Sequence, residues 1–117
     1  MFKTQFACEV KNFDPNELFD RKEARRFDRY SQLALKAAKE AIENSGLDLE
    51  KEDTNRIGVI FSAGIGGIKT FEEEVGNYYL TQDKGPRFNP FFIPKMIADI
   101  AAGHISMIYG LRGPNYA

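Results

Sequence analysis

A strand, a glycine-rich turn and a helix are predicted in direct succession between Arg56 and Glu74. The first part is a short apolar run rich in β-branched residues, and the last part has apolar side chains at helical spacing. The strand residues are Ile57, Val59, Ile60 and Phe61, and the helix stripe is Ile68, Phe71, Val75, Tyr78 and Tyr79. Glycine at 64, 66 and 67 lets the backbone adopt positive φ and lets other groups approach closely. Such units commonly bind ligands in α/β proteins.

Composition limits the functions open to the 117 residues. The chain is 43% hydrophobic, enough for a real core, and its net charge of -1 gives no reason to expect nucleic acid or a membrane surface as a partner. The single cysteine, Cys8, excludes an internal disulfide and offers no thiolate cluster for zinc. We therefore expect no metal and no cofactor, and a reducing, cytoplasmic setting.

The N-terminal part of the chain alternates apolar and other side chains. Phe6, Cys8 and Val10 would occupy one face of a strand. Cys8 is then interpreted as a small buried core residue rather than a reactive thiol, because nothing basic adjoins it on that face.

A dense basic segment follows, with the sequence RKEARRFDR over residues 21–29. On a helix, Lys22, Arg25, Arg26 and Arg29 would share one face. Two interpretations follow from the residues alone: a solvated face, which we favour, or a docking patch for an acidic partner.

Two longer helices are predicted. The first carries a mostly alanine stripe and stops at Gly46, and the second begins at Pro94 and stops at Gly110. The first stripe is Tyr30, Leu33, Ala34, Ala37, Ala38, Ala41 and Ile42. The only histidine, His104, lies on the apolar face of the second helix, so a hydrogen-bonded core histidine is favoured over a catalytic base. No triad or metal-site spacing surrounds it.

The apolar residues Phe91, Phe92 and Ile93, framed by two prolines, are expected on a loop. They could fold onto the core or form an exposed patch that another subunit covers, and the residues alone favour neither.

Phosphate binding at the glycine turn is disfavoured by the details of the sequence. A P-loop needs glycine directly before the Lys-Thr pair, where Ile68 stands, and a dinucleotide fingerprint needs glycine at the position of Lys69. The apolar side chains around the turn, Ile65, Ile68 and Phe71, suit contact with hydrocarbon better than contact with phosphate. Spacing alone identifies no complete active site.

Three stretches together resemble one family. RKEARRFDR with the alanine-rich helix, RIGVIFSAGIGGIKTFEE, and NPFFIPKMIADIAAGHISMIYGLRGPN are similar to the type II β-ketoacyl-acyl carrier protein synthases. The resemblance implies an α/β fold, a partial thiolase-like fold with an incomplete N-terminal αβα half. It also implies decarboxylative Claisen condensation of an acyl-enzyme with malonyl-acyl carrier protein, which elongates acyl chains in fatty acid biosynthesis.

The resemblance also implies roles for particular residues. Ile65 and Phe92 match positions that line the acyl pocket, and Phe92 is the aromatic that reaches across the dimer interface. Phe91, Phe92, Ile93 and Pro94 are accordingly expected at a homodimer contact. Lys22, Arg25 and Arg26 match the basic positions that dock the acidic carrier protein, which reverses the preference for a solvated face. The implied partners are acyl carrier protein and acyl and malonyl thioesters.

By the same resemblance the nucleophilic cysteine would lie just past Ala117, and both catalytic histidines further on. Neither Cys8 nor His104 matches a catalytic position. Residues 1–117 are therefore expected to be an internal, inactive fragment of the N-terminal thiolase-like ketosynthase domain. The alternatives are a non-catalytic carrier-docking or dimerisation module, and a fragment of a chain-length-factor-type subunit.

Overall fold

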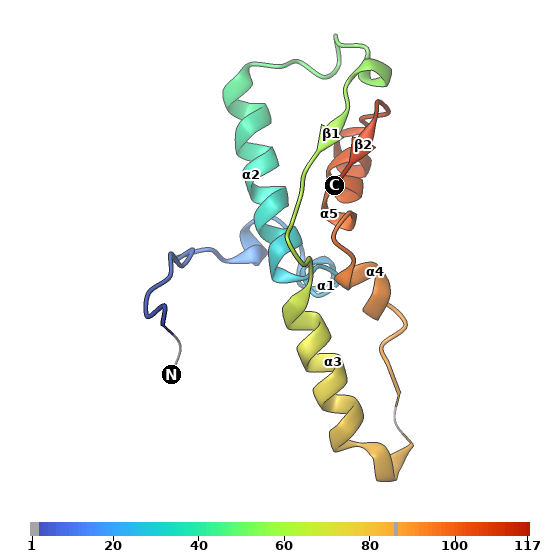
Figure 1. Cartoon of the computed structure of the whole chain (residues 1–117). Helices are drawn as coiled ribbons and strands as arrows, with labels where there is room; N and C mark the ends of the chain where they lie inside the picture. Colours follow the sequence, from blue (N-terminus) through green and yellow to red (C-terminus); the bar gives the residue numbers. More distant parts are fainter. Residues whose placement is uncertain (1–2, 86) are drawn as a thin grey trace.

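The structure, a computed structural model, describes residues 3–85 and 87–117 (Figure 1). The α-helices are α1 (Arg21–Ala24), α2 (Arg29–Ser45), α3 (Ile68–Leu80), α4 (Phe92–Met96) and α5 (Ile100–Tyr109). The strands are β1 (Val59–Ile60) and β2 (Asn115–Tyr116), and single 3-10 turns lie at Pro15–Glu17, Thr54–Arg56 and Gln82–Lys84.

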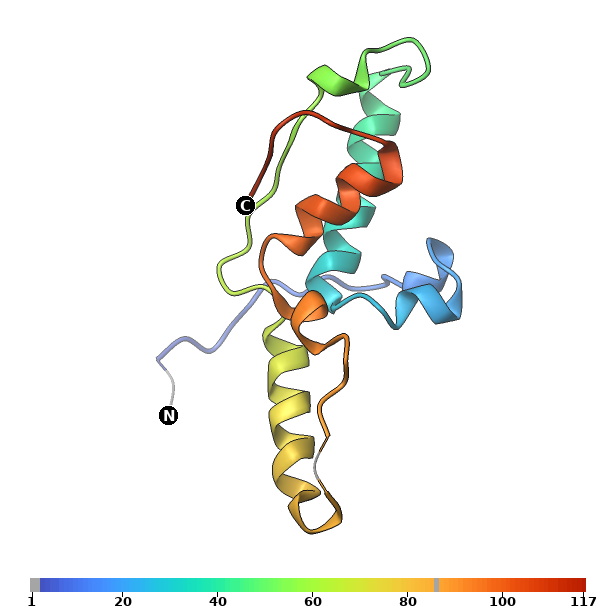
Figure 2. The ribbon, with the colours of Figure 1, turned by 90° about the vertical axis from the view of Figure 1, so that its right-hand side faces the viewer.

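The molecule is elongated, with principal extents of 56 × 36 × 26 Å. Its upper part in Figure 2 contains α2, α5 and the two strands, while α3 projects downward as an arm whose connecting chain returns to α4. The glycine turn lies where this arm meets the upper part.

The sheet has two short parallel strands in the described part of the chain. Val59 lies opposite Asn115, and Ile60 opposite Tyr116. The strand predicted over residues 57–61 therefore exists but is shorter, and its predicted burial holds for Val59 while Ile60 is 80% exposed. A strand with a neighbour on one side has few ladder hydrogen bonds to extend it.

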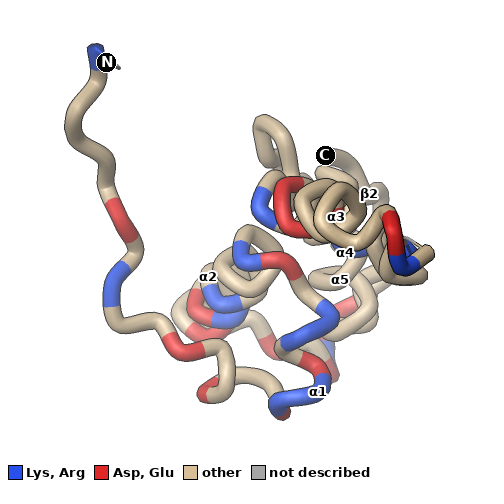
Figure 3. Tube along the Cα trace, turned by 90° about the horizontal axis from the view of Figure 1, so that it is seen from below, with Lys and Arg blue, Asp and Glu red and all other residues tan. Residues whose placement is uncertain are grey.

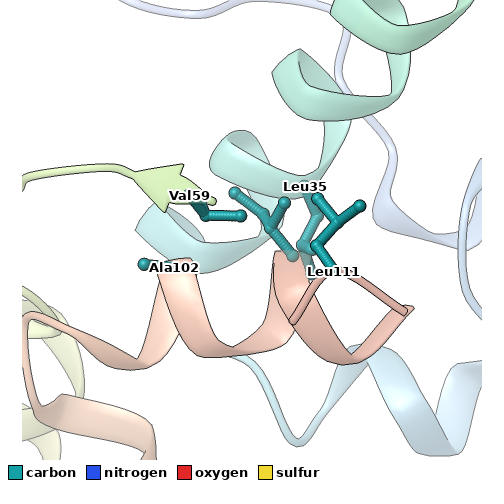
Figure 4. Close-up of a cluster of buried hydrophobic side chains, with 5 residues drawn as sticks. Leu35, Val59, Ala102 and Leu111 are labelled. Atoms are coloured by element: carbon teal, nitrogen blue, oxygen red, sulfur yellow. The ribbon is translucent and has the colours of Figure 1, made fainter. Parts of the chain in front are cut away.

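A small apolar core joins α2, α5 and β1. Its buried members are Leu35, Val59, Ala102, Ile105 and Leu111 (Figure 4). The predicted helix and its stop are confirmed, since α2 ends at Gly46 with φ 69°. The predicted stripe is partly wrong, because Leu35 is buried and Ala37 and Ala41 are exposed. The residues of α2 that are buried all lie in its N-terminal half, while in its C-terminal half Ala38 is partly buried against the core and Ala41 is exposed.

The predicted N-terminal strand is wrong. Residues 3–11 form no strand, and Figure 1 shows this segment extending away from the body of the molecule. Phe6 is 86% exposed and Cys8 is exposed, so the buried-core interpretation of Cys8 is also wrong. Alternation gives a segment an apolar face, but a strand also needs a neighbour to pair its backbone groups.

The helix predicted to begin at Pro94 is interrupted. Chain direction changes at Ile97, with φ -60° and ψ 142°, and separates α4 from α5. The apolar residues expected on a loop are also helical, since α4 includes Phe92, Ile93 and Pro94. Tertiary partners explain the break: Tyr30 Oη donates to the Ile97 carbonyl, and Gly67 N donates to the Met96 carbonyl at 2.8 Å. These carbonyls are thus satisfied without continuing the helix.

Candidate functional site

The basic segment does not form one helix, which corrects the predicted shared face. Helix α1 covers only four residues, Lys22 lies within it, and Arg25 and Arg26 follow in the turn. Arg29 begins a separate helix, α2, because Asp28 caps that helix and interrupts the segment. The positive charges therefore spread over a helix, a turn and a second helix.

Asp20 stabilises the start of α1. Its Oδ1 accepts hydrogen bonds from Lys22 N at 2.7 Å and Glu23 N at 2.8 Å. The pKa of Asp20 is lowered, chiefly by the hydrogen bond from the Glu23 backbone. The carboxylate therefore stays charged and continues to cap the helix. This cap fixes the backbone from which Lys22 projects.

The three predicted docking residues are accessible. Lys22, Arg25 and Arg26 are all exposed, and Figure 3 shows blue Lys and Arg segments around α1. Within residues 3–85 and 87–117, none of the three forms an ion pair; the ion pairs lie on α2, on α3 and in the connection after α2. Asp20 interacts electrostatically with Lys22 and Arg26, but exposed charges that no ion pair occupies can still bind another molecule.

Asp28 links the basic segment to the glycine turn. It is only 5% exposed, and its Oδ1 accepts from Tyr30 N at 3.0 Å as the N-cap of α2. Its Oδ2 accepts from both Thr70 N at 3.1 Å and Thr70 Oγ1 at 2.6 Å. Thr70 lies in the first turn of α3, whose own N-cap is Gly67 and has no side chain. One buried carboxylate therefore caps two helices, which satisfies donors that would otherwise be unpaired.

Sequence reasoning did not identify this function of Asp28. The available signal was an Asp directly before an apolar-periodic helix, which indicates an N-cap. The second capping interaction joins residues 42 positions apart, and local sequence holds no signal for it.

The glycine turn brings α3 against the junction between α4 and α5. Gly66 has φ 80°, and a Cβ there would lie 2.5 Å from the Met96 carbonyl oxygen. A Cβ on Gly67 would lie 2.9 Å from the Lys95 carbonyl oxygen and 3.1 Å from Asp28 Oδ2. The close approach that the sequence predicts for these glycines is confirmed, and here the approaching groups are protein backbone and a carboxylate.

The two predicted acyl-pocket residues have different surroundings. Ile65 is 69% exposed in the turn before α3. Phe92 is half-buried at the start of α4, where its ring stacks on Phe88 with centroids 5.5 Å apart and lies 6.2 Å from Phe71. Phe88 in turn stacks on Tyr78 at 4.9 Å. Phe92 thus extends an aromatic cluster along α3, and the acyl-pocket function of both residues stays a prediction.

The residues beside Phe92 are open to solvent. Phe91 is 58% exposed and Ile93 54% exposed, and Pro94 is exposed as well. Of the two alternatives that the sequence left open, this exposure favours a surface patch over burial in the core of this chain. The homodimer contact at this patch stays a prediction.

His104 has an aromatic partner. Its ring meets Phe27 edge-to-face, with centroids 4.6 Å apart and an interplanar angle of 74°. Burial lowers the pKa of His104, which favours the neutral imidazole. Within the described part of the chain its side chain forms no hydrogen bond to another residue, so the expected hydrogen-bonded core histidine is instead a half-buried ring packed on Phe27.

Residues 3–85 and 87–117 offer neither a cluster of metal ligands nor a helix suited to crossing a membrane. No group of three or more His, Cys, Asp or Glu side chains there could hold a metal ion. None of the helices described has the length and apolar character that crossing a bilayer requires.

The sequence of this chain is similar to that of known β-ketoacyl synthases. Residues 2–117 match the sequence model of the β-ketoacyl synthase N-terminal domain. The chain is 44% identical to 3-oxoacyl-[acyl-carrier-protein] synthase 2 of Staphylococcus aureus and 43% identical to the protein of that name from Vibrio cholerae. Both alignments cover 99% of this chain and 28% of the relative. The chain thus spans less than a third of the length of these curated relatives.

A solved structure agrees with the sequence comparison. The chain is similar to one in a complex described as a type II PKS acyl-carrier protein with its ketosynthase bound to the hexaketide, with a TM-score of 0.77 and 26% identity. The likeness covers 88% of this chain and 29% of that chain. The elements described here therefore fit part of a thiolase-like fold, with much helix and little sheet. Because the family model matches nearly every residue, the chain belongs to the β-ketoacyl synthase N-terminal domain family.

Proposed function

We propose that this chain contributes the carrier-docking surface and part of the acyl pocket of a β-ketoacyl-acyl carrier protein synthase. The complete reaction is decarboxylative Claisen condensation of an acyl-enzyme with malonyl-acyl carrier protein, which elongates acyl chains in fatty acid biosynthesis. The observation that supports the proposal most directly is that Lys22, Arg25 and Arg26 are exposed and that none of them forms an ion pair with the residues that the structure describes. A similar solved ketosynthase is in complex with an acyl-carrier protein.

An acidic carrier protein approaching exposed cations experiences an attraction that speeds encounter and orients the complex. Asp28 then connects the docking segment to the start of α3 through two hydrogen bonds to Thr70. A carrier bound at Lys22, Arg25 and Arg26 would therefore lie on the side of the molecule where Arg25 and the start of α3 line one cavity.

The acyl chain requires an apolar environment. Ile65 lies in the glycine turn and Phe92 in the aromatic cluster beside α3, and both could cover hydrocarbon. Each buried methylene contributes about 0.8 kcal/mol to binding such a chain. We assign these two residues to the acyl pocket, and Phe91, Phe92, Ile93 and Pro94 to the contact between subunits of a homodimer.

Charge reversal tests the docking proposal. Lys22→Glu, Arg25→Glu and Arg26→Glu together should weaken binding of an acyl carrier protein by about tenfold or more at low salt, with a smaller effect at high salt. Fluorescence anisotropy with a labelled carrier protein measures the affinity. The matched control reverses three lysines elsewhere, Lys36, Lys39 and Lys51, each of which forms an ion pair within the chain. Equal losses in the two triple variants would refute the docking site, because net charge alone would then account for the effect.

A further inference from the structure

A second group of cations lines a cavity beside α1. The cavity has a volume of about 600 Å³ and is open to solvent. Its cationic lining residues are Arg21, Arg25, Arg29, Lys69 and Lys95. They come from α1, the turn after it, α2, α3 and α4, so five different segments of the chain direct positive charge to one place.

The carboxylates of this cavity do not neutralise it. Asp28 and Glu73 also line it, which leaves a formal excess of three positive charges. Asp28 is buried, and both its oxygens accept hydrogen bonds from Tyr30 and Thr70. Glu73 lies 3.8 Å from Lys69, and both side chains of that pair are more than half exposed. Such a long, exposed ion pair contributes little to stability, so Lys69 can readily leave Glu73 and pair with another group.

The walls of the cavity are held together by buried contacts. Asp28 joins the start of α2 to the start of α3. Gly67 N donates to the Met96 carbonyl and thereby joins α3 to α4. Arg29 is positioned as well, since its Nη1 donates to the Phe13 carbonyl at 3.3 Å and its guanidinium lies 4.6 Å from the centre of the Phe13 ring. The backbone that carries these charges and the Arg29 side chain are therefore held in place before binding, which lowers the conformational entropy lost on binding.

We infer that the carrier-docking surface continues from Arg25 into this cavity, where Lys69 of α3 and Lys95 of α4 contact carboxylates of an acidic carrier protein. The inference rests on the proposed function and extends it, since Arg25 belongs both to the docking set and to the cavity lining. The extension gives the carrier a direct contact with α3 and α4, the helices that carry the aromatic cluster around Phe92. Charge complementarity selects an acidic protein surface as the occupant.

Paired charge reversals test the extension. Lys69→Glu with Lys95→Glu should weaken carrier binding about tenfold at low salt, and the loss should shrink as salt screens the charges. The control, Lys36→Glu with Lys39→Glu, makes the same change of net charge on the exposed face of α2 and should shift affinity less than about twofold. Affinity of the full chain for a labelled acyl carrier protein is measured by anisotropy, and circular dichroism checks that each variant is folded.

The outcomes separate the two proposals. If Lys22→Glu with Arg26→Glu weakens binding while the Lys69 and Lys95 pair behaves like the control, the cavity inference is overturned and the docking proposal stands. If neither pair weakens binding more than the control, carrier docking by this surface is itself refuted. The milder variants Lys69→Gln and Lys95→Gln remove the charges without reversing them. They should give a smaller loss in the same direction, and no loss in folded protein would also overturn the inference.

Discussion

A single buried carboxylate connects the two parts of the molecule that matter most for the proposed function. Asp28 ends the basic segment, begins α2 and caps α3 through Thr70. Gly67 is needed beside it, because a Cβ at that position would lie 3.1 Å from Asp28 Oδ2. At the scale of one residue, the position of the proposed docking charges relative to α3 therefore depends on Asp28.

Replacing this carboxylate should destabilise the chain. Asp28→Ala removes the caps of two helices, at about 1 kcal/mol each, and leaves the buried Thr70 hydroxyl without its acceptor. We expect a total loss of about 2–4 kcal/mol in the free energy of unfolding, measured by urea denaturation. Asp14→Ala, which removes the cap of an exposed 3-10 turn, is the control and should cost less. Equal losses in the two variants would show that Asp28 contributes no more than an ordinary exposed cap.

At the scale of elements, the glycine turn determines how α3 meets the junction of α4 and α5. The turn needs positive φ at Gly66 and close backbone contact with Met96. The Met96 carbonyl accepts a hydrogen bond from the Gly67 N–H, and this interaction helps to end α4. The sequence predicted the glycine turn but not the helix break at Ile97. The break is thus a consequence of packing against that turn.

Two glycine substitutions in adjoining elements should have opposite effects. Gly66→Ala should destabilise the chain by about 2 kcal/mol or more, because alanine disfavours positive φ and its Cβ would clash with the Met96 carbonyl. Gly76→Ala lies within α3 with no atom near the added Cβ, and should stabilise by about 0.5–1 kcal/mol. Thermal denaturation of both variants provides the measurement. A neutral Gly66→Ala would mean that the turn tolerates a different backbone path.

At the scale of the whole molecule, much apolar surface remains uncovered. Phe6, Ile60, Tyr79 and Leu80 are each more than 65% exposed, and the elongated shape leaves α3 and α4 as an arm. Exposed apolar surface of this kind marks contacts with other protein. Open edges beside the short strands add unpaired backbone groups that favour association.

The isolated chain should therefore self-associate as its concentration rises. Phe91→Asp with Ile93→Asp places charges on the exposed α4 patch and should shift the association midpoint to about tenfold higher concentration. Asn44→Asp with Gln82→Asp adds the same two charges at exposed polar positions and should leave the midpoint nearly unchanged. Sedimentation velocity over a concentration series distinguishes these variants. A wild-type chain that sediments as a monomer at every concentration would contradict the prediction.

Sequence by itself determined where the two longer helical segments stop. Gly46 ends α2, and Gly110 ends α5 with φ 65°, as predicted. The prediction succeeded because a helix satisfies its own backbone within a few residues, so caps and periodicity suffice. The motifs also identified the family, since they match it over nearly the whole chain.

Tertiary structure alone decided which apolar faces were covered and where backbone groups found distant partners. The alternation around Cys8 produced no strand, and Ile60 remained exposed, because pairing and burial require neighbours that a local pattern does not specify. The same reason explains why the second cap made by Asp28 and the meeting of Lys69 with Lys95 were absent from the prediction. Both depend on segments far apart in the chain, which only packing brings together.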